Sequence, residues 1–221
     1  GFFRTATKDV VRLQTAEGPS LRLTHDHRVR RVTRQTRWST ETEWCEAGSL
    51  AAGDRVLLNN HRSAGEWQGE RSYEEGFLLG LLVGDGTLKR DAAVLSVWPQ
   101  AAAVNAGSNV PMALMDEALR CAQALPHRTD FTGWMEVKGP GEHRLKLAAL
   151  RDLAFDMGMT PGDKSITPAV EKTSSGFHRG FLRGMFDADG SVQGSQEKGV
   201  SVRLAQSDLP RLEAVQRMLQ R

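Results

Sequence analysis

The stretch at residues 78–86, LLGLLVGDG, recurs later in the chain as LRGMFDADG at residues 182–190. Both copies share the frame Leu-x-Gly-apolar-apolar-x-small-Asp-Gly, and a phenylalanine precedes each of them. A strand-like segment follows each copy, at 93–98 and at 200–204. The chain therefore repeats a helix–strand unit, rather than a helix alone.

Small residues define one flat face on each expected helix. Gly80 and Gly84 lie four positions apart, as do Gly184 and Ala188, so each pair shares a helix face. A glycine inside a helix costs about 1 kcal/mol relative to alanine, which indicates a packing reason for it. We expect the two helices to pack against each other through these faces, backbone to backbone.

Each expected helix finishes with an aspartate before a glycine, and we expect Gly86 to end the first helix as a left-handed cap. A carboxylate in this place faces the negative end of the helix dipole, which is unfavourable for stability. If the helices pair, Asp85 and Asp189 meet and repel each other unless a proton or a cation lies between them. Mg²⁺ prefers such oxygen ligands, and metal-bound water attacking a phosphodiester is the chemistry that follows.

The rest of the chain divides into two parts. The first 60 residues are typical of a small all-β module, with strands at 10–15 and 20–24 in a hairpin and another strand at 55–58. Residues 61–72 are polar and contain glycine, so we expect a linker there. Beyond it, periodicity predicts helices at 73–86, 111–124, 147–158, 175–190 and 207–219.

Composition excludes several classes of protein. Apolar residues make up 39% of the chain and charged residues 25%, as in a globular protein with a core. No apolar run is long enough for a membrane span, and the first residues lack the core of a secretory signal. Cys45 and Cys121 are too few for a disulfide framework or a four-thiolate zinc site, so we expect a reducing, cytoplasmic location.

The net charge of +2 hides an uneven distribution. Basic residues predominate over residues 1–37, whereas acidic residues predominate over residues 38–76. This pattern permits a polyanionic partner for one face, although an ordinary solvated surface is the commoner explanation.

The repeated motifs resemble the paired motifs of LAGLIDADG homing endonucleases of the type embedded in inteins, and residues 182–190 are the closer match. Val83 stands where the family often has an earlier aspartate, whereas Asp85 and Asp189 match its metal-binding position. The resemblance implies an α+β fold with a pseudo-symmetric αββαββ domain at 73–221. It also implies Mg²⁺ held by the two aspartates, and double-stranded DNA gripped by saddle-shaped sheets.

The same family has a lysine near each active centre. Residues 162–168, GDKSITP, resemble its Lys-x-Ile-Pro stretch with Thr167 as an extra residue, so Lys164 is a candidate catalytic residue. It would polarise the attacking water or stabilise negative charge on the phosphorane. Lys146, on an expected strand at 143–147, is the alternative.

Residues 21–29, LRLTHDHRV, resemble the Thr-x-x-His block of intein splicing domains, called Hint modules. The resemblance implies a partial Hint module at 1–60, in which Thr24 hydrogen-bonds the peptide bond at the upstream splice junction. His27 would activate that amide for an acyl shift, and an imidazole that titrates near neutral pH suits this proton transfer. His25 is a competing imidazole, but only His27 has the spacing of the family.

The chain begins with Gly1 instead of the Cys or Ser nucleophile of inteins, and it ends at Arg221 instead of in His-Asn. We therefore expect an intein fragment without splice junctions, truncated at its C-terminus and unable to splice. Its predicted function is site-specific, Mg²⁺-dependent cleavage of both DNA strands by a monomer, and host-protein exteins would be partners of the complete element. A catalytically inert DNA-binding protein and a splicing-only remnant are the alternatives.

Overall fold

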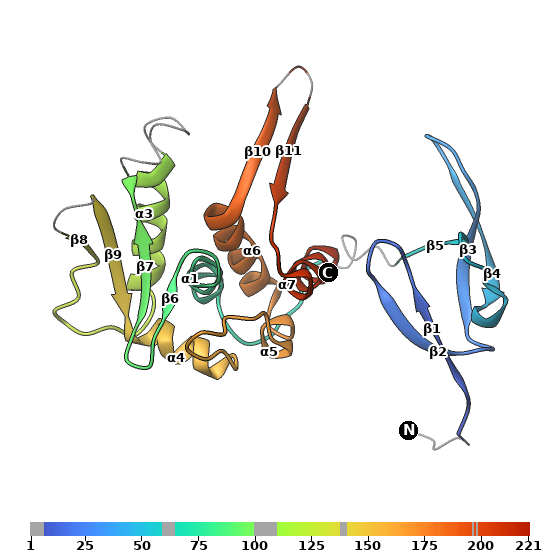
Figure 1. Cartoon of the computed structure of the whole chain (residues 1–221), viewed down its shortest axis with the longest axis horizontal. Coiled ribbons are helices and arrows are strands. Elements are labelled where there is room, and N and C mark those ends of the chain that lie inside the picture. The colour runs from blue at the N-terminus through green and yellow to red at the C-terminus, as the bar shows by residue number, and fades with distance from the viewer. Residues whose placement is uncertain (1–6, 59–64, 100–109, 138–140, 196, 198) are drawn as a thin grey trace. The chain divides into compact units, whose positions relative to one another are not determined.

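The computed structural model describes residues 7–58, 65–99, 110–137, 141–195, 197 and 199–221. The chain forms two compact units, one built on residues 1–64 and one on residues 65–219, which we describe separately (Figure 1). Both units contain small antiparallel sheets, and the described α-helices begin in the second unit. The α+β class expected from the sequence is confirmed.

The first unit consists of short strands, as its sequence predicts. β1 (Val10–Gln14) pairs with β2 (Ser20–Thr24) in the expected hairpin. A second sheet has the order β4-β3-β5 and contains β3 (Arg28–Gln35), β4 (Thr40–Glu46) and β5 (Arg55–Val56), with the 3₁₀ turn η1 (Ala47–Ser49) after β4. The β3–β4 hairpin escapes sequence prediction, because arginine and glutamate occupy many positions where a half-buried strand would alternate apolar residues.

The second unit contains a four-stranded antiparallel sheet in the order β6-β7-β9-β8. Its strands are β6 (Thr87–Leu88), β7 (Ala93–Val97), β8 (Trp134–Val137) and β9 (Glu142–Leu147). Leu145 of β9 lies opposite both Leu95 and Trp134, so these three side chains share one sheet face. Helices bury this face in the main hydrophobic core.

The helices of this unit are α1 (Tyr73–Val83), α3 (Val110–Gln123), α4 (Ala148–Asp156), α5 (Pro168–Glu171), α6 (Ser175–Asp189) and α7 (Leu209–Gln220). All five predicted helices are present, and the short α5 is an addition. Within the described residues, none of them combines the length and the apolar character that crossing a membrane requires.

The order of elements repeats within this unit. α1 is followed by β6, β7 and α3, and α6 is followed by β10 (Gly190–Ser195), β11 (Gly199–Leu204) and α7. α1 and α6 lie side by side, and each leads into its own antiparallel strand pair (Figure 1). Among the described elements, the repeat seen in the sequence is therefore a repeat of a helix, a pair of strands and a further helix.

Serine side chains begin both central helices. The Ser72 hydroxyl accepts the N–H of Glu75, whose carboxylate accepts the N–H of Ser72 in return, and this capping box begins α1. Ser174 caps α6 by accepting the N–H of Phe177. The predicted left-handed cap at Gly86 is wrong, because α1 ends at Val83 and the φ angle of Gly86 is not positive. Hydrogen bonds from a distant lysine satisfy the carbonyl groups of this end instead.

The segment expected as a linker, 61–72, behaves differently over its described residues. Residues 65–72 belong to the second unit and pack against the start of α6. The Trp67 indole N–H donates to the Thr173 carbonyl at 2.8 Å, and the Ser174 N–H donates to the Glu70 carbonyl at 3.1 Å. These bonds satisfy polar groups near a buried helix start, which is why this polar stretch is ordered.

Candidate functional site

Glycines join α1 and α6 in a reciprocal contact. A Cβ atom added at Gly80 would collide with the carbonyl oxygen of Phe181, and one added at Gly184 would collide with that of Phe77. The same contact occurs one turn earlier in the pairs Gly76–Phe177 and Gly180–Tyr73. Equivalent positions of the two sequence motifs therefore make equivalent contacts, which confirms the predicted close packing of the two helices.

Asp85 and Asp189 lie at the same end of this helix pair. A Cβ atom on Gly84, the neighbour of Asp85, would lie 2.5 Å from the Ala188 Cβ and 3.4 Å from Asp189 Oδ2. The Asp85 side chain reaches solvent, but surrounding atoms exclude part of its water, and this desolvation raises its pKa. The negative charge of Asp189 raises the pKa of Asp85 further. The fold thus brings together two acids that are far apart in the sequence.

Lys164 closes the carboxyl end of α1. Its Nζ donates to the carbonyl oxygens of Leu82 at 2.8 Å, Gly84 at 3.2 Å and Gly86 at 2.6 Å. An ammonium group has three N–H donors, so these carbonyl groups occupy all of them. Lys164 is therefore held in one place, on the loop between α4 and α5 that the sequence motif predicts.

The charge of Lys164 lies within range of both acids. Burial lowers the pKa of this lysine, as does the positive charge of Arg211, whereas Asp189 and Asp85 each raise it. The positive charge of Lys164 in turn lowers the pKa of Asp85, which opposes the rise caused by burial and by Asp189. The site thus contains a fixed positive charge beside the two carboxylates.

Two further residues at this site carry no sequence signal of their own. Gln206 follows β11, and its Nε2 donates to Asp189 Oδ2 at 2.5 Å. Arg211, in the first turn of α7, has 19% of its side chain exposed and forms a long ion pair of 3.8 Å with Asp208. Its buried Nε has no hydrogen-bond partner within the described residues. Both residues reach the site only because β11 folds back on β10, which no short motif reveals.

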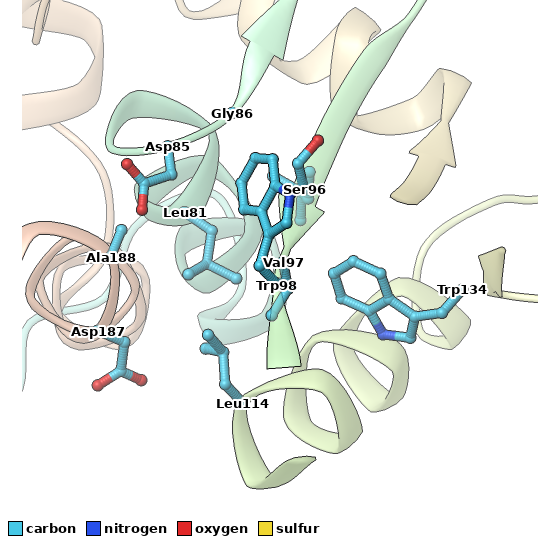
Figure 2. Close-up of a pocket in the computed structure, with 11 residues that line it drawn as sticks. Leu81, Asp85, Gly86, Ser96, Val97, Trp98, Leu114, Trp134, Asp187 and Ala188 are labelled. Atoms are coloured by element: carbon cyan, nitrogen blue, oxygen red, sulfur yellow. The ribbon is translucent and has the colours of Figure 1, made fainter. Parts of the chain in front are cut away.

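A cavity of about 270 Å³ opens beside Asp85 (Figure 2). Its lining is mainly apolar and includes Leu81, Trp98, Leu114 and Trp134. Asp187 also borders it, but its carboxylate points away from Asp85 (Figure 2). This carboxylate forms an ion pair of 3.5 Å with Arg183. Burial raises the pKa of Asp187. Asp187 therefore belongs to the cavity wall, and the carboxylate pair consists of Asp85 and Asp189.

Lys146 lies on β9 and is exposed, on the open face of the sheet. It pairs with Val94 of β7, which pairs with Thr87 of β6, whereas the neighbouring Leu145 and Leu147 point into the core. Since adjacent strands are about 4.8 Å apart, Lys146 is roughly 10 Å from the strand that follows Asp85. Lys146 stays a predicted catalytic candidate, and its exposed side chain also suits a contact with an extended partner.

Thr24 and His27 lie together in the first unit. The backbone N–H of His27 donates to the Thr24 carbonyl at 3.1 Å, so the two residues close the turn between β2 and β3. The Thr24 side chain hydrogen-bonds to Asp26, and this bond, with the ammonium of Lys8, lowers the pKa of Asp26 to about 2. His25 packs instead against Gly48.

The donor atoms around the two acids suit a hard cation. Within the ranges that the structure describes, no group of three or more His, Cys, Asp or Glu side chains could hold a metal ion. The oxygen ligands at hand are the carboxylates of Asp85 and Asp189. Mg²⁺ fits this set, because it retains several waters and commonly uses substrate phosphates to complete its octahedron.

Residues 176–221 match the family model described as a LAGLIDADG-like domain. The match runs from the first turn of α6 through β10 and β11 to the end of the chain, so it includes Asp189, Gln206 and Arg211. This finding supports the predicted LAGLIDADG resemblance for the C-terminal part and suggests DNA cleavage of the homing-endonuclease type. The intein and splicing assignments for residues 1–60 stay predictions.

Proposed function

We propose that the second unit is a Mg²⁺-dependent endonuclease that hydrolyses phosphodiester bonds in both strands of double-stranded DNA at a specific site. The observation that carries this proposal is the meeting of Asp85 and Asp189 at one end of the α1–α6 pair. Two carboxylates held together against their repulsion are an arrangement that a divalent cation stabilises. The LAGLIDADG-like match over residues 176–221 supports the same class of reaction.

Asp85 and Asp189 would hold the metal, which when bound lowers the pKa of a water molecule and draws negative charge from the phosphate. Lys164 would act through its charge, because its three N–H groups are already bonded to carbonyl oxygens of the α1 end. A fixed positive charge there stabilises the negative charge that develops on the phosphate. It does not require Lys164 to exchange a proton.

Arg211 is suited to bind the phosphate directly. Its guanidinium is largely buried near Lys164, and its Nε–H donor has no acceptor within the described residues. Guanidinium groups bind phosphate oxygens with short, charge-assisted hydrogen bonds. A phosphate bound by the other nitrogens of the guanidinium would lie between two neighbouring positive charges.

Two polar surfaces would contact the DNA backbone. One is the open face of the β6–β9 sheet, which carries Lys146. The other is the polar face of the β10–β11 hairpin, where Ser191 pairs with Arg203 and Gln193 with Ser201. The approximate two-fold relation between the halves matches that between the strands of a duplex. Phosphate contacts would supply affinity, and contacts in the major groove would supply sequence preference.

For the first unit we propose part of an intein splicing module. Thr24 and His27 would bind and activate the upstream peptide bond, and the turn that holds them together supports this assignment. Host-protein exteins would then flank the complete element. Expression of this frame within its native flanking sequences tests the proposal: cleavage at the upstream junction should be lost in H27A, and retention of cleavage would reject this role of His27.

A plasmid cleavage assay tests the nuclease proposal. The plasmid carries the joined coding sequences that flank this reading frame, without the frame itself. In Mg²⁺ the wild-type chain should linearise it, whereas D85N and D189N should bind the same DNA in a gel-shift assay and leave the plasmid intact. Binding without cleavage by the wild-type chain would identify an inert DNA-binding protein instead, and absence of both would overturn the proposal.

A further inference from the structure

We propose that one face of the β4-β3-β5 sheet, in the first unit, binds single-stranded DNA. This arginine–tryptophan face is defined by Arg28, Arg30, Trp44 and Arg55. It belongs to a different unit from the candidate nuclease site, and it includes neither of the two residues assigned to splicing. Binding there would be a further activity of the chain.

The strand register places these four side chains on the same side of the sheet. β3 and β4 form a long hairpin in which Arg30 lies opposite Trp44 (Figure 1). On the other edge of β3, Val32 lies opposite Arg55 of β5. Every second residue of a strand shares a sheet face, so Arg28, Arg30 and Val32 point the same way. The residues opposite them in β4 and β5 point that way too.

The opposite face of this sheet carries arginines that are paired with acids. Arg31 lies opposite Glu43, and its Nε donates to Glu43 Oε1 at 3.0 Å. Arg31 also forms an ion pair of 3.5 Å with Asp54. Beyond a bulge in β3, Arg34 lies opposite Glu41, with an ion pair of 3.8 Å. The sheet itself therefore neutralises the positive charges of this face.

Arginines of the arginine–tryptophan face bond to neutral groups instead. Arg30 donates to the Thr42 hydroxyl at 2.6 Å, and Arg55 donates to the side-chain carbonyl of Gln35 at 2.8 Å. Among the residues that the structure describes, none of the three arginines forms an ion pair. Glu46 is the one acid that the register places on this face. Three positive charges thus face one negative charge, and the excess is available to a polyanion.

Two tryptophans offer flat aromatic surfaces beside these charges. Trp44 is 57% exposed and Trp38, in the turn between β3 and β4, is 84% exposed. The Arg30 guanidinium lies over the Trp44 ring at 5.7 Å from its centroid, and Arg37 lies over Trp38 at 4.9 Å. The Thr36 hydroxyl accepts the backbone N–H of Trp38 at 3.2 Å, which gives the turn a defined shape. Both rings are therefore exposed on ordered elements.

The combination of charge and exposed rings indicates a single-stranded nucleic acid. Arginines bind phosphate oxygens with charge-assisted hydrogen bonds. Unpaired bases stack on exposed aromatic side chains, whereas a duplex already buries the faces of its bases in its own stack. A duplex would therefore use the arginines of this face and leave both tryptophans in water.

The choice of DNA over RNA rests on the function proposed for the second unit, because both units belong to one chain and would meet the same nucleic acid. The preference for a single strand does not rest on that function, since it follows from the exposed rings and the unpaired charges. Ribose differs from deoxyribose by its 2′-hydroxyl, so both kinds of oligonucleotide are compared below.

Fluorescence anisotropy of a labelled oligothymidine of about 20 nucleotides, longer than the usual site of one binding face, tests the stacking. The full chain is used in EDTA, so that cleavage cannot occur. W44L and W38L should each weaken binding at least about fivefold without changing its salt dependence. W98L, a tryptophan of the second unit that is 44% exposed, should bind as the wild type and is the matched control.

The same assay at several salt concentrations tests the charges. R30Q should lower the slope of log K against log salt by about 0.7, the value for one phosphate contact on a single strand. R34Q is the matched control, because Arg34 lies on the same strand but on the opposite face and is paired with Glu41. Its slope should equal that of the wild type.

Three outcomes would overturn the proposal. They are wild-type affinity in both W44L and W38L, equal loss of duplex and single-strand binding in W44L, and tighter binding of an oligouridine RNA than of the oligothymidine. W38L alters a turn outside the sheet, so it tests stacking even if W44L disturbs the strands. Plasmid cleavage decides the nuclease proposal separately, because a chain that cleaves need not bind the oligonucleotide, and a chain that binds it need not cleave.

Discussion

Gly80 and Gly184 occupy equivalent positions in α1 and α6, and each faces a backbone carbonyl of the opposite helix with no room for a Cβ atom. This reciprocal contact fixes the position of each helix along the axis of the other. One turn further on, Gly84 meets Ala188, and the two acids follow directly. The geometry of the candidate site is thus a consequence of the helix interface.

Substitution G80A should destabilise the second unit. The new methyl group would meet the rigid backbone carbonyl of Phe181, and overpacking of this kind costs about 1–3 kcal/mol. We expect the free energy of unfolding in urea to fall by about 2 kcal/mol. G176A is the matched control, because its nearest neighbour atom is 3.7 Å away and alanine is the better helix former, so this change should be neutral or slightly stabilising. Equal stability of G80A and wild type would contradict the described interface.

Substitution D85N should stabilise the metal-free protein at neutral pH. The raised pKa of Asp85 means that the folded state binds this proton more readily than the unfolded state, so stability declines as pH rises from about 4 through the raised pKa. D85N removes that decline. We expect a higher melting temperature than that of the wild type at pH 7, and almost no difference at pH 3.

In the presence of Mg²⁺, the wild-type chain should melt at a higher temperature than D85N. A ligand that binds only the folded state stabilises it, so Mg²⁺ should raise the melting temperature of the wild-type chain and not that of D85N. D116N, an exposed carboxylate on α3, should behave as wild type in both conditions. A wild-type melting temperature that does not respond to millimolar Mg²⁺ would count against metal binding by the protein alone.

Substitution K164M should loosen the end of α1. Three carbonyl groups would lose their donor, and each partly buried group left unsatisfied costs about 1–3 kcal/mol, less where water reaches it. Amide hydrogen exchange at Gly86, whose N–H donates to the Leu81 carbonyl, should accelerate at least about tenfold. K172M, at an exposed position after α5, should leave this exchange rate unchanged.

Cys121 should resist alkylation in the folded protein. Burial raises its pKa to about 12, and the thiolate is the reactive form, so its labelling by iodoacetamide at pH 8 should be negligible. Cys45 is only half-buried and is the internal comparison. Mass spectrometry of the modified peptides should find label on Cys45 alone until urea unfolds the second unit. Early labelling of Cys121 would show that its surroundings in the core open readily.

Substitution K146A should weaken DNA binding without changing sequence preference. One phosphate contact fewer should lower the slope of log K against log salt by about 1 unit. Fluorescence anisotropy at several salt concentrations measures this slope, and K172A serves as the comparison. An unchanged slope would place the DNA elsewhere than on the open face of the β6–β9 sheet.

Several features follow from local sequence alone. The glycine spacing predicts a close helix contact because residues four apart share a helix face, and that inference needs no knowledge of the rest of the chain. The five helices and the β1–β2 hairpin follow from hydrophobic periodicity and turn residues. The charged β3–β4 hairpin does not, since its strands are specified by cross-strand pairing rather than by burial.

The end of α1 shows where local rules fail. Gly86 has the sequence context of a left-handed cap, but its φ angle is not positive. Lys164, distant in the chain, donates to the Leu82 carbonyl at the end of α1 and to the carbonyls of Gly84 and Gly86 that follow it. Similarly, residues 65–72 have the composition of a linker but supply hydrogen bonds to the start of α6. In both places partners that are distant in the sequence supply hydrogen bonds that local sequence does not predict.

The repeated motif by itself determined that two helices would pair and that Asp85 and Asp189 would meet, because side-chain size and helical period act over a few residues. Only the tertiary structure decided what surrounds those acids. Three further side chains reach the site from separate places: Lys164 from a loop, Gln206 from the end of a strand and Arg211 from the start of a helix. They come together through reversals of the chain that no periodic pattern in the sequence predicts. A repeat fixes equivalent backbones but not the side chains that pack against them.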